Sequence, residues 1–215
     1  MVGSRCEYFK LSRICVTTSK ARAYYALVSR LRKAGLPFSS AVPESDFGEC
    51  DVVLTTEDES ERFGDKALLL ERLDEDPGVF KGQVVSRLGG EEDLILVGID
   101  PGKRTGLAVF YGRTKLSSNT FDSIAALCSR VAAYARAMPT SRIVVRIGNG
   151  NRVMAEELAD HVGTEVPAAT VELVDESGTS LRSSKMKGVQ RDQAAAAKIA
   201  FRKGEAVSPP TRSQS

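Results

Sequence analysis

The chain of 215 residues is poor in three features that often reveal a function: histidine, closely spaced cysteines and long apolar runs. Its only histidine, His161, lies beside Val162 in a stretch expected to be helical, and the sequence offers it no partner nucleophile. This disfavours a Ser-His-Asp or Cys-His mechanism unless His161 is the base. We expect a satisfied or solvent-facing side chain instead.

The four cysteines, Cys6, Cys15, Cys50 and Cys128, are far apart and form no C-x-x-C pair. Together with the single histidine, this spacing disfavours a structural zinc site, and we expect reduced thiols, most of them buried. The sequence has no apolar run of about 18 residues, and residues 1–10 are polar and charged, so neither a membrane span nor a secretory signal is predicted. A cytoplasmic protein without a membrane partner is expected.

Charge is distributed unevenly along the chain. Residues 44–76 carry 13 acidic and three basic side chains, whereas residues 182–203 carry seven basic side chains and one acid, Asp192. A polyanionic partner would be attracted to the second region only. The alternative is that these cations form a solvated helix face.

Periodicity predicts a small α/β domain in residues 1–90. Its expected strands are 13–18, 37–42 and 51–55, and its expected helices are 19–34, 65–73 and 77–88. Ser19 can cap the first helix and Gly35 can end it. The stretch 88–93, Leu-Gly-Gly-Glu-Glu-Asp, combines backbone freedom with charge and marks a domain boundary.

Residues 93–203 predict a second α/β domain. The expected strands are 94–100, 106–111, 114–121, 142–147 and 170–175, and the expected helices are 122–138, 151–162 and 191–203. Three strands in succession, followed by strand–helix alternation, predict a mixed sheet that is antiparallel on one side and parallel on the other. Residues 204–215 are expected to be a flexible tail.

Two of the predicted strands end in acidic residues. Asp100 closes the apolar run 94–100, which is typical of a buried central strand, and a carboxylate there needs a reason. The strand 170–175 leads into Asp175 and Glu176, and period-two alternation allows at most one of them to face Asp100. The alternatives are a turn-capping role for Asp100 and solvated strand-end charges for the other two.

A third acid lies in the first turn of the last predicted helix. Asp192 shares a helix face with Ala195, Ala196 and Ile199, which must pack on the sheet, so Asp192 is predicted to point inward. The run of four alanines would let this helix approach the sheet closely. A helix cap or a partner of the helix dipole is the alternative role for Asp192.

These carboxylates, on separate elements, are predicted to meet at one edge of the sheet. Carboxylate oxygens without a histidine or a thiolate suit Mg²⁺ or Mn²⁺ better than zinc. Two such ions can activate a water molecule and stabilise the leaving oxygen of a phosphodiester displacement. The pattern therefore indicates metal-dependent chemistry on phosphodiesters.

Three motifs resemble the RuvC and YqgF-type nucleases of the ribonuclease-H-like superfamily. Residues 98–108, Gly-Ile-Asp-Pro-Gly-Lys-Arg-Thr-Gly-Leu-Ala, resemble the opening strand and turn of that family. Residues 175–180, Asp-Glu-Ser-Gly-Thr-Ser, are similar to the D-E-x-x-T-S/T signature of the YqgF branch, and residues 192–197 are similar to its final D-x-A-A-A helix. The resemblance implies a ribonuclease-H-like mixed sheet flanked by helices for residues 93–203.

The same resemblance implies roles for individual residues. Asp100, Glu176 and Asp192 would be the catalytic, metal-binding acids, which favours Glu176 over Asp175. The implied substrate-binding residues are Lys103, Arg104, Thr179 and Ser180 beside the scissile phosphate, with Arg182 and Lys185 on the flanking backbone.

The implied function is a Mg²⁺- or Mn²⁺-dependent endonuclease that acts on structured nucleic acid, either a DNA junction or precursor ribosomal RNA. One alternative is a nucleic-acid-binding or assembly module that kept the fold and lost turnover. Another is an actin-type or sugar-kinase-type ATPase, whose first phosphate loop also follows a strand with D-x-G. That fold needs a second phosphate loop, which residues 1–90 do not show.

The acidic stretch from Glu44 to Asp76 argues against nucleic acid on that face of the N-terminal domain, so partner binding or homodimerisation is the expected role. The helix 19–34 nevertheless carries five cations, which keeps a nucleic-acid role open. These are Lys20, Arg22, Arg30, Arg32 and Lys33.

Overall fold

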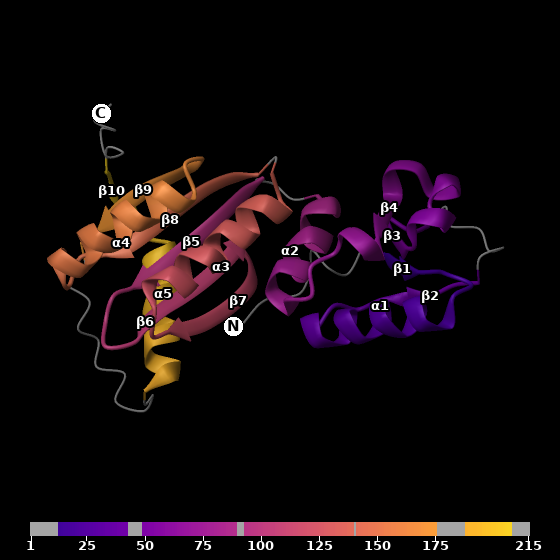
Figure 1. The fold of residues 1–215 in the computed structure, drawn as a ribbon, viewed down its shortest axis with the longest axis horizontal. Coiled ribbons are helices and arrows are strands. Elements are labelled where there is room, and N and C mark those ends of the chain that lie inside the picture. Colours follow the sequence, from indigo (N-terminus) through magenta and orange to yellow (C-terminus); the bar gives the residue numbers. More distant parts are fainter. Residues whose placement is uncertain (1–12, 43–48, 90–92, 140, 176–187, 208–215) are drawn as a thin grey trace, which may run out of the picture. The chain divides into compact units, whose positions relative to one another are not determined.

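The computed structural model describes residues 13–42, 49–89, 93–139, 141–175 and 188–207. The chain divides into an N-terminal unit, Met1–Gly89, and a C-terminal unit, Gly90–Ser215. The division falls inside the stretch 88–93, where the sequence places a boundary. Both units are α/β, as the sequence predicts (Figure 1).

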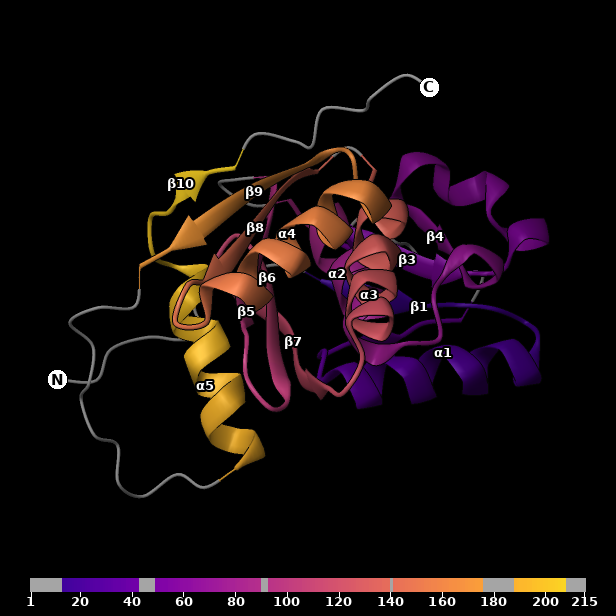
Figure 2. The same ribbon diagram turned by 60° about the vertical axis from the view of Figure 1, so that its left-hand side comes forward.

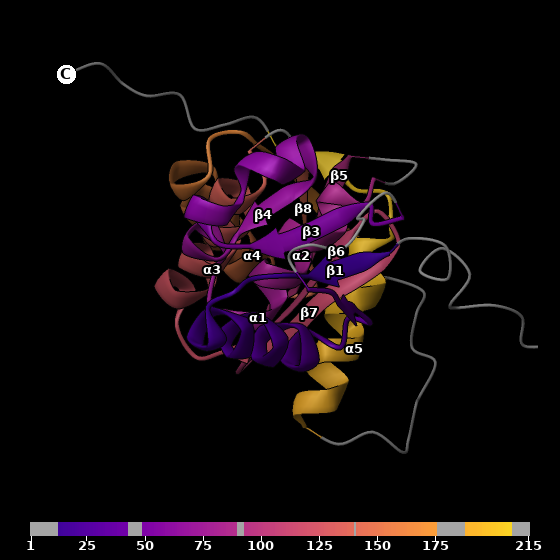
Figure 3. The same cartoon turned by 90° about the vertical axis from the view of Figure 1, so that its right-hand side faces the viewer.

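The N-terminal unit is built on a small parallel sheet. Its elements are β1 (Ile14–Val16), α1 (Ala21–Ala34), β2 (Ser39–Ser40), β3 (Val52–Thr55), 3-10 turns at Glu57–Glu59 and Glu61–Lys66, β4 (Ala67–Leu69), a 3-10 turn at Leu70–Arg72, and α2 (Pro77–Arg87). Among the described residues the strand order is β2-β1-β3-β4, and every neighbouring pair is parallel. Figure 3 shows α1 running along one face of this sheet, where Leu27 and Leu31 are fully buried.

Helix α1 ends as the sequence predicts but begins differently. Gly35 adopts a left-handed conformation with φ 66°, and its amide donates to the carbonyls of Leu31 and Arg32. At the start, Lys20 occupies the N-cap position without a side-chain hydrogen bond, so Ser19 is not the cap. Ser19 instead donates from its amide and its hydroxyl to the carboxylate of Glu59. Hydrogen bonds to a charged acceptor are stronger than those between neutral groups, so this arrangement is preferred to capping of the helix.

The predicted helix at 65–73 is wrong. Ala67–Leu69 form β4, which pairs with β3 so that Val53 lies opposite Ala67. Alanine and leucine favour a helix intrinsically, but the open edge of β3 satisfies their backbone groups in an extended conformation. Tertiary pairing therefore overrides local propensity in this segment.

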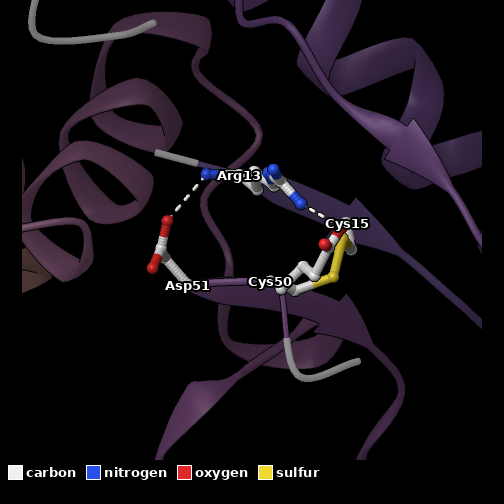
Figure 4. Close-up of a disulfide and its surroundings, with 5 residues drawn as sticks. Arg13, Cys15, Cys50 and Asp51 are labelled. Carbon is white, nitrogen blue, oxygen red and sulfur yellow. Dashed lines mark hydrogen bonds and ion pairs between the residues drawn. A yellow bond between two sulfur atoms is a disulfide. The ribbon is translucent and has the colours of Figure 1, made fainter. Parts of the chain in front are cut away.

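Two of the cysteines predicted to be reduced form a disulfide. Cys15 on β1 and Cys50, just before β3, are bonded with their Cα atoms 5.9 Å apart (Figure 4). Beside them, the amide of Arg13 donates to Asp51 Oδ2 at 2.8 Å. The two cysteines are 35 residues apart in the sequence, so no local pattern predicts their contact. They lie close together because β1 and β3 are neighbouring strands. Cys128, in contrast, is a free and buried thiol, as expected.

The C-terminal unit contains a larger, mixed sheet. Its elements are β5 (Leu94–Asp100), β6 (Thr105–Tyr111), β7 (Thr114–Phe121), α3 (Ile124–Ala137), β8 (Arg142–Gly148), α4 (Arg152–Glu165), β9 (Ala169–Val174), α5 (Val189–Ala200) and β10 (Glu205–Ala206). In the part of the chain that is described, the strand order is β10-β9-β8-β5-β6-β7. The neighbours β5, β6 and β7 are antiparallel, whereas β5, β8 and β9 are parallel, which confirms the predicted mixed sheet.

The helices of this unit cover both faces of its sheet. Figures 1 and 2 show α3 and α4 on one face and α5 crossing the other. The α5 face is packed by alanines, larger aliphatic side chains and one phenylalanine: Leu96, Ala108, Phe110, Val144, Ala196 and Ala200. Alternation along the strands sends the intervening residues, such as the fully buried Ile95, Val97 and Ile99, to the α3 and α4 face.

The end of the chain differs from the flexible tail predicted from residue 204. Glu205 and Ala206 form β10, which pairs antiparallel with β9. Gly204 lies so close to β9 that a Cβ there would be 2.8 Å from the Cβ of Glu172, and this close approach starts the pairing. Residues 208–215 lie outside the described residues.

No described helix combines the length and the apolar character that a membrane span requires. The cytoplasmic location stays a prediction.

Candidate functional site

Asp100 is the last residue of β5, in the middle of the sheet. It is half-buried and pairs with Gly106 on β6, while β8 flanks β5 on its other side. Residues two apart on a strand share a face, so Asp100 lies on the same face as Gly98. A Cβ at Gly98 would be 2.8 Å from the Cβ of Ala200, which identifies this face as the one that α5 covers.

Helix α5 approaches the sheet closely because the strands below it carry glycine. A Cβ at Gly98 would also lie 2.6 Å from the amide nitrogen of Ala200, and a Cβ at Gly106 would lie 2.8 Å from the carbonyl carbon of Asp192. Both distances are too short for a side chain. The alanines of α5, predicted to allow close approach, therefore meet glycines on the strands, a requirement that the sequence analysis does not identify.

This approach brings Asp192 beside Asp100. The Cβ of Asp192 is 3.4 Å from the position that a Cβ would take at Gly106, and Gly106 is the direct cross-strand partner of Asp100. Because cross-strand Cβ atoms are about 5 Å apart, the Cβ atoms of the two aspartates are at most about 9 Å apart. Both carboxylates are half-buried, and they lie on one face of one sheet, as the sequence predicts.

Asp192 is not the cap of α5. Gly188 occupies the N-cap position, has a φ of 56° and offers no side chain, whereas Asp192 lies further along, in the first turn. Its carboxylate still lies near the amino-terminal end of α5, where an acidic side chain is favourable.

Lys103 and Arg104 lie in the turn that joins β5 to β6, directly after Asp100. Both are exposed, and the Arg104 guanidinium pairs with Asp122 at 3.5 Å. Exposed ion pairs of this kind contribute little to stability and exchange readily. The two cations are thus available to a polyanion that approaches the end of β5.

The other predicted site residues lie outside the described residues: Glu176, Thr179, Ser180, Arg182 and Lys185. The described part of β9 places Glu172 and Val174 on the α5 face, because Glu172 pairs across the sheet with Arg146 on that face. Asp175 directly follows β9 and is exposed. Its carbonyl oxygen accepts a hydrogen bond from the Arg202 guanidinium at 2.9 Å.

Within the described ranges, no cluster of three or more histidine, cysteine, aspartate or glutamate side chains could hold a metal ion. Asp100 and Asp192 supply two carboxylates, and the third predicted acid, Glu176, is not among these residues. His161 is exposed on α4, which agrees with the solvent-facing role expected from the sequence.

An ion pair that the sequence analysis missed anchors α5. The Arg146 guanidinium donates to Glu172 Oε2 and to the carbonyl oxygen of Ala200, each at 2.8 Å. Both side chains are only 18% exposed. Cations near a helix C-terminus satisfy its free carbonyls, so this pair fixes the end of α5 opposite to Asp192. An arginine at position 146, within the apolar run 143–147, was the available signal.

No protein-family model matches the sequence, and no curated protein matches it either. The function is therefore argued from the side chains themselves, and the resemblance to RuvC and YqgF-type nucleases stays a prediction.

Proposed function

We propose that the C-terminal unit is a ribonuclease-H-like nuclease that hydrolyses phosphodiester bonds in structured nucleic acid with Mg²⁺ or Mn²⁺. Asp100, Asp192 and Glu176 would hold the metal. The observation that carries the proposal is the pair of half-buried aspartates on one face of the sheet, at most about 9 Å apart at Cβ. Two carboxylates whose Cβ atoms are this close can share one divalent ion or hold two neighbouring ions.

The architecture supports the same proposal. The mixed sheet with helices on both faces is the arrangement that the motif resemblance implies for residues 93–203. Glu176 is the third ligand in this proposal because the motif resemblance assigns the metal to Glu176 and not to Asp175. A bound divalent ion would supply an activated water molecule and charge stabilisation at the leaving oxygen.

The remaining residues have positioning roles in this proposal. Lys103 and Arg104 follow Asp100 in an exposed turn, where they can contact the phosphates on either side of the scissile bond. The Arg146–Glu172 pair holds α5 against the sheet and thereby keeps Asp192 in place. Thr179, Ser180, Arg182 and Lys185 complete the proposed substrate contacts.

A cleavage assay tests the proposal. The purified full chain is incubated with a labelled four-way DNA junction, duplex DNA and structured RNA, with Mg²⁺, with Mn²⁺ and with a chelator. We expect cleavage of at least one substrate that requires the metal. Loss of a residue that only supports a metal ligand typically costs about 10–100-fold, so loss of a ligand itself, in Asp100→Asn or Asp192→Asn, should lower the rate by at least about a hundredfold.

The control variant is Asp160→Asn, which removes an exposed carboxylate on α4, on the opposite face of the sheet, and should cleave at the wild-type rate. Binding of all substrates without metal-dependent cleavage would overturn the nuclease and favour the inactive binding module instead. Equal activity of wild type and Asp100→Asn would overturn the metal site.

A further inference from the structure

The N-terminal unit contains a cavity of about 460 Å³ at the carboxyl ends of β1 and β3. It is lined by Thr17, Thr18, Thr55, Asp58, Glu59, Glu61, Arg62 and Phe63. In the sheet order β2-β1-β3-β4, the chain continues from β1 to β2 on one side of β1 and then to β3 on its other side. The order of the strands therefore changes direction between β1 and β3. In open parallel sheets, ligands bind outside the carboxyl ends of the strands at such a reversal.

Two buried hydroxyls in this cavity make no hydrogen bond. Thr17 is 1% exposed and Thr55 is 0% exposed, and the Oγ1 atom of each is without a partner. They are neighbours, because Val16 and Leu54 pair in register and each threonine comes one residue later in its chain segment, Thr17 directly after β1 and Thr55 at the end of β3. Buried polar atoms are normally satisfied, so a pair of adjacent unsatisfied hydroxyls at a cavity indicates a missing polar partner.

The charge of the lining selects the sign of that partner. Asp58, Glu59 and Glu61 line the cavity together with one guanidinium, that of Arg62, and Asp58 is already ion-paired with Lys20. The carboxylates still outnumber the cations, so an anion such as phosphate would be disfavoured. Glu59 stays ionised over the whole physiological range. Its burial acts to raise its pKa, but hydrogen bonds from Ser19 and from the Thr18 and Thr56 hydroxyls outweigh burial and lower the pKa to about 2.

A metal ion is a poorer fit than an organic cation. The described carboxylates form no cluster of three that could coordinate a metal, and the Thr17 and Thr55 hydroxyls are weaker ligands than carboxylates for hard cations. A primary ammonium carries three hydrogen-bond donors, which match two hydroxyl acceptors and one carboxylate. The Phe63 ring, only 9% exposed, offers an apolar surface to the carbon chain of the ligand.

We propose that this cavity binds a small organic cation whose primary ammonium group is held by the Thr17 and Thr55 hydroxyls and the Glu61 carboxylate. The volume suits a compound larger than a water molecule, since pockets for small molecules start near about 300 Å³. All residues that line the cavity lie in the N-terminal unit, so the test of this site is independent of the test of the nuclease proposed for the C-terminal unit.

Calorimetry on the full chain with three probes of equal length tests the proposal. The probes are 1,4-diaminobutane, 1,4-butanediol and succinate, which place an ammonium, a hydroxyl or a carboxylate on the same four-carbon scaffold. We expect the diamine alone to bind. Thr17→Val and Thr55→Val keep the side-chain volume and remove the hydroxyl, and each should weaken diamine binding at least about tenfold, because hydrogen bonds to charged groups are the stronger class.

Three further variants separate this site from general attraction to an acidic surface. Thr55→Ser, unlike Thr55→Val, keeps a hydroxyl at this position and should bind the diamine as the wild type does. Glu61→Gln removes an exposed carboxylate of the cavity, so it should fold normally and weaken binding. Ser118→Ala removes another buried unpaired hydroxyl, but in the C-terminal unit, and should leave binding unchanged.

Several results would overturn the proposal. Absence of heat with the diamine at millimolar concentration would mean that water alone satisfies the two hydroxyls. Tighter binding of succinate than of the diamine would reverse the sign of the ligand. Diamine binding that both valine variants retain at full strength would place the cation elsewhere on the acidic surface.

Discussion

Gly106 on β6 lies directly beneath the main chain of Asp192 in the first turn of α5. A methyl group at position 106 would be 2.8 Å from the carbonyl carbon of Asp192. Because Gly106 also pairs with Asp100, one residue without a side chain sets the spacing between the two proposed metal ligands. The geometry of the candidate site therefore depends on a contact between a helix and a strand, and several measurable consequences follow from such contacts.

Gly106→Ala should push α5 away from the sheet. Overpacking of this kind costs about 1–3 kcal/mol, and we expect a loss of that size in the free energy of unfolding from urea titrations followed by circular dichroism. Gly102→Ala is the matched control, since its new methyl group would be 3.3 Å from one carbonyl oxygen, that of Arg104, a contact that a small shift relieves. Equal stability of the two variants would show that α5 does not press on β6.

Asp192→Asn should stabilise the protein when divalent ions are removed by a chelator. The two carboxylates, whose Cβ atoms are at most about 9 Å apart, repel each other, and removing one charge should raise the free energy of unfolding by about 1 kcal/mol. With millimolar Mg²⁺ the order should reverse, because only the wild type gains from binding the ion. Thermal melts of both proteins with and without Mg²⁺ measure this crossing. A variant that is less stable than wild type in the chelator would contradict it.

Stability should fall in acid through Glu59. The pKa of this group is lowered from 4.5 to about 2 in the folded chain, so its contribution is present above pH 4.5 and is lost as the pH falls toward 2. Glu59→Gln should remove this part of the pH dependence and lower stability at pH 7. Urea unfolding at several pH values between 2 and 7 measures it. Glu157→Gln, an exposed glutamate on α4, serves as the control and should keep the wild-type profile.

Reduction of the Cys15–Cys50 disulfide should destabilise the chain. The bond closes a loop across 35 residues, and a crosslink of this length contributes about 3–4 kcal/mol by restricting the unfolded state. Urea unfolding with and without a reductant measures the difference. The double variant Cys15→Ala and Cys50→Ala should be less stable than the oxidised wild type and insensitive to the reductant. Identical unfolding of oxidised and reduced wild type would contradict the prediction.

The elements of the C-terminal unit were predictable because their signals are local. The strands 94–100 and 114–121 have their predicted bounds, and the other predicted strands and helices of this unit differ at their ends by a few residues. Asp192 was placed on the inner face of its helix from the 3.6-residue period alone, and the strand register then put it beside Asp100. Local patterns were sufficient here because each element carries a clear apolar face.

The features that were missed depend on residues far apart in the chain. Neither Cys15 nor Cys50 carries a local sign of the other, and β4 is a strand only because the edge of β3 is next to it. The cavity beside Thr17 and Thr55 requires two strands to lie in register, which no short segment specifies. Contacts of this kind arise from tertiary packing, so single-sequence patterns do not contain them.

Strand β10, short as it is, has a consequence for assembly. The free edge of a sheet is a template for pairing with another chain, and β10 covers the edge of β9 with two exposed residues. At the far edge, β7 presents a polar segment that includes Lys115 and Asn119. Within the described residues, neither edge strand is a long apolar segment, so edge-to-edge pairing of two such sheets is disfavoured.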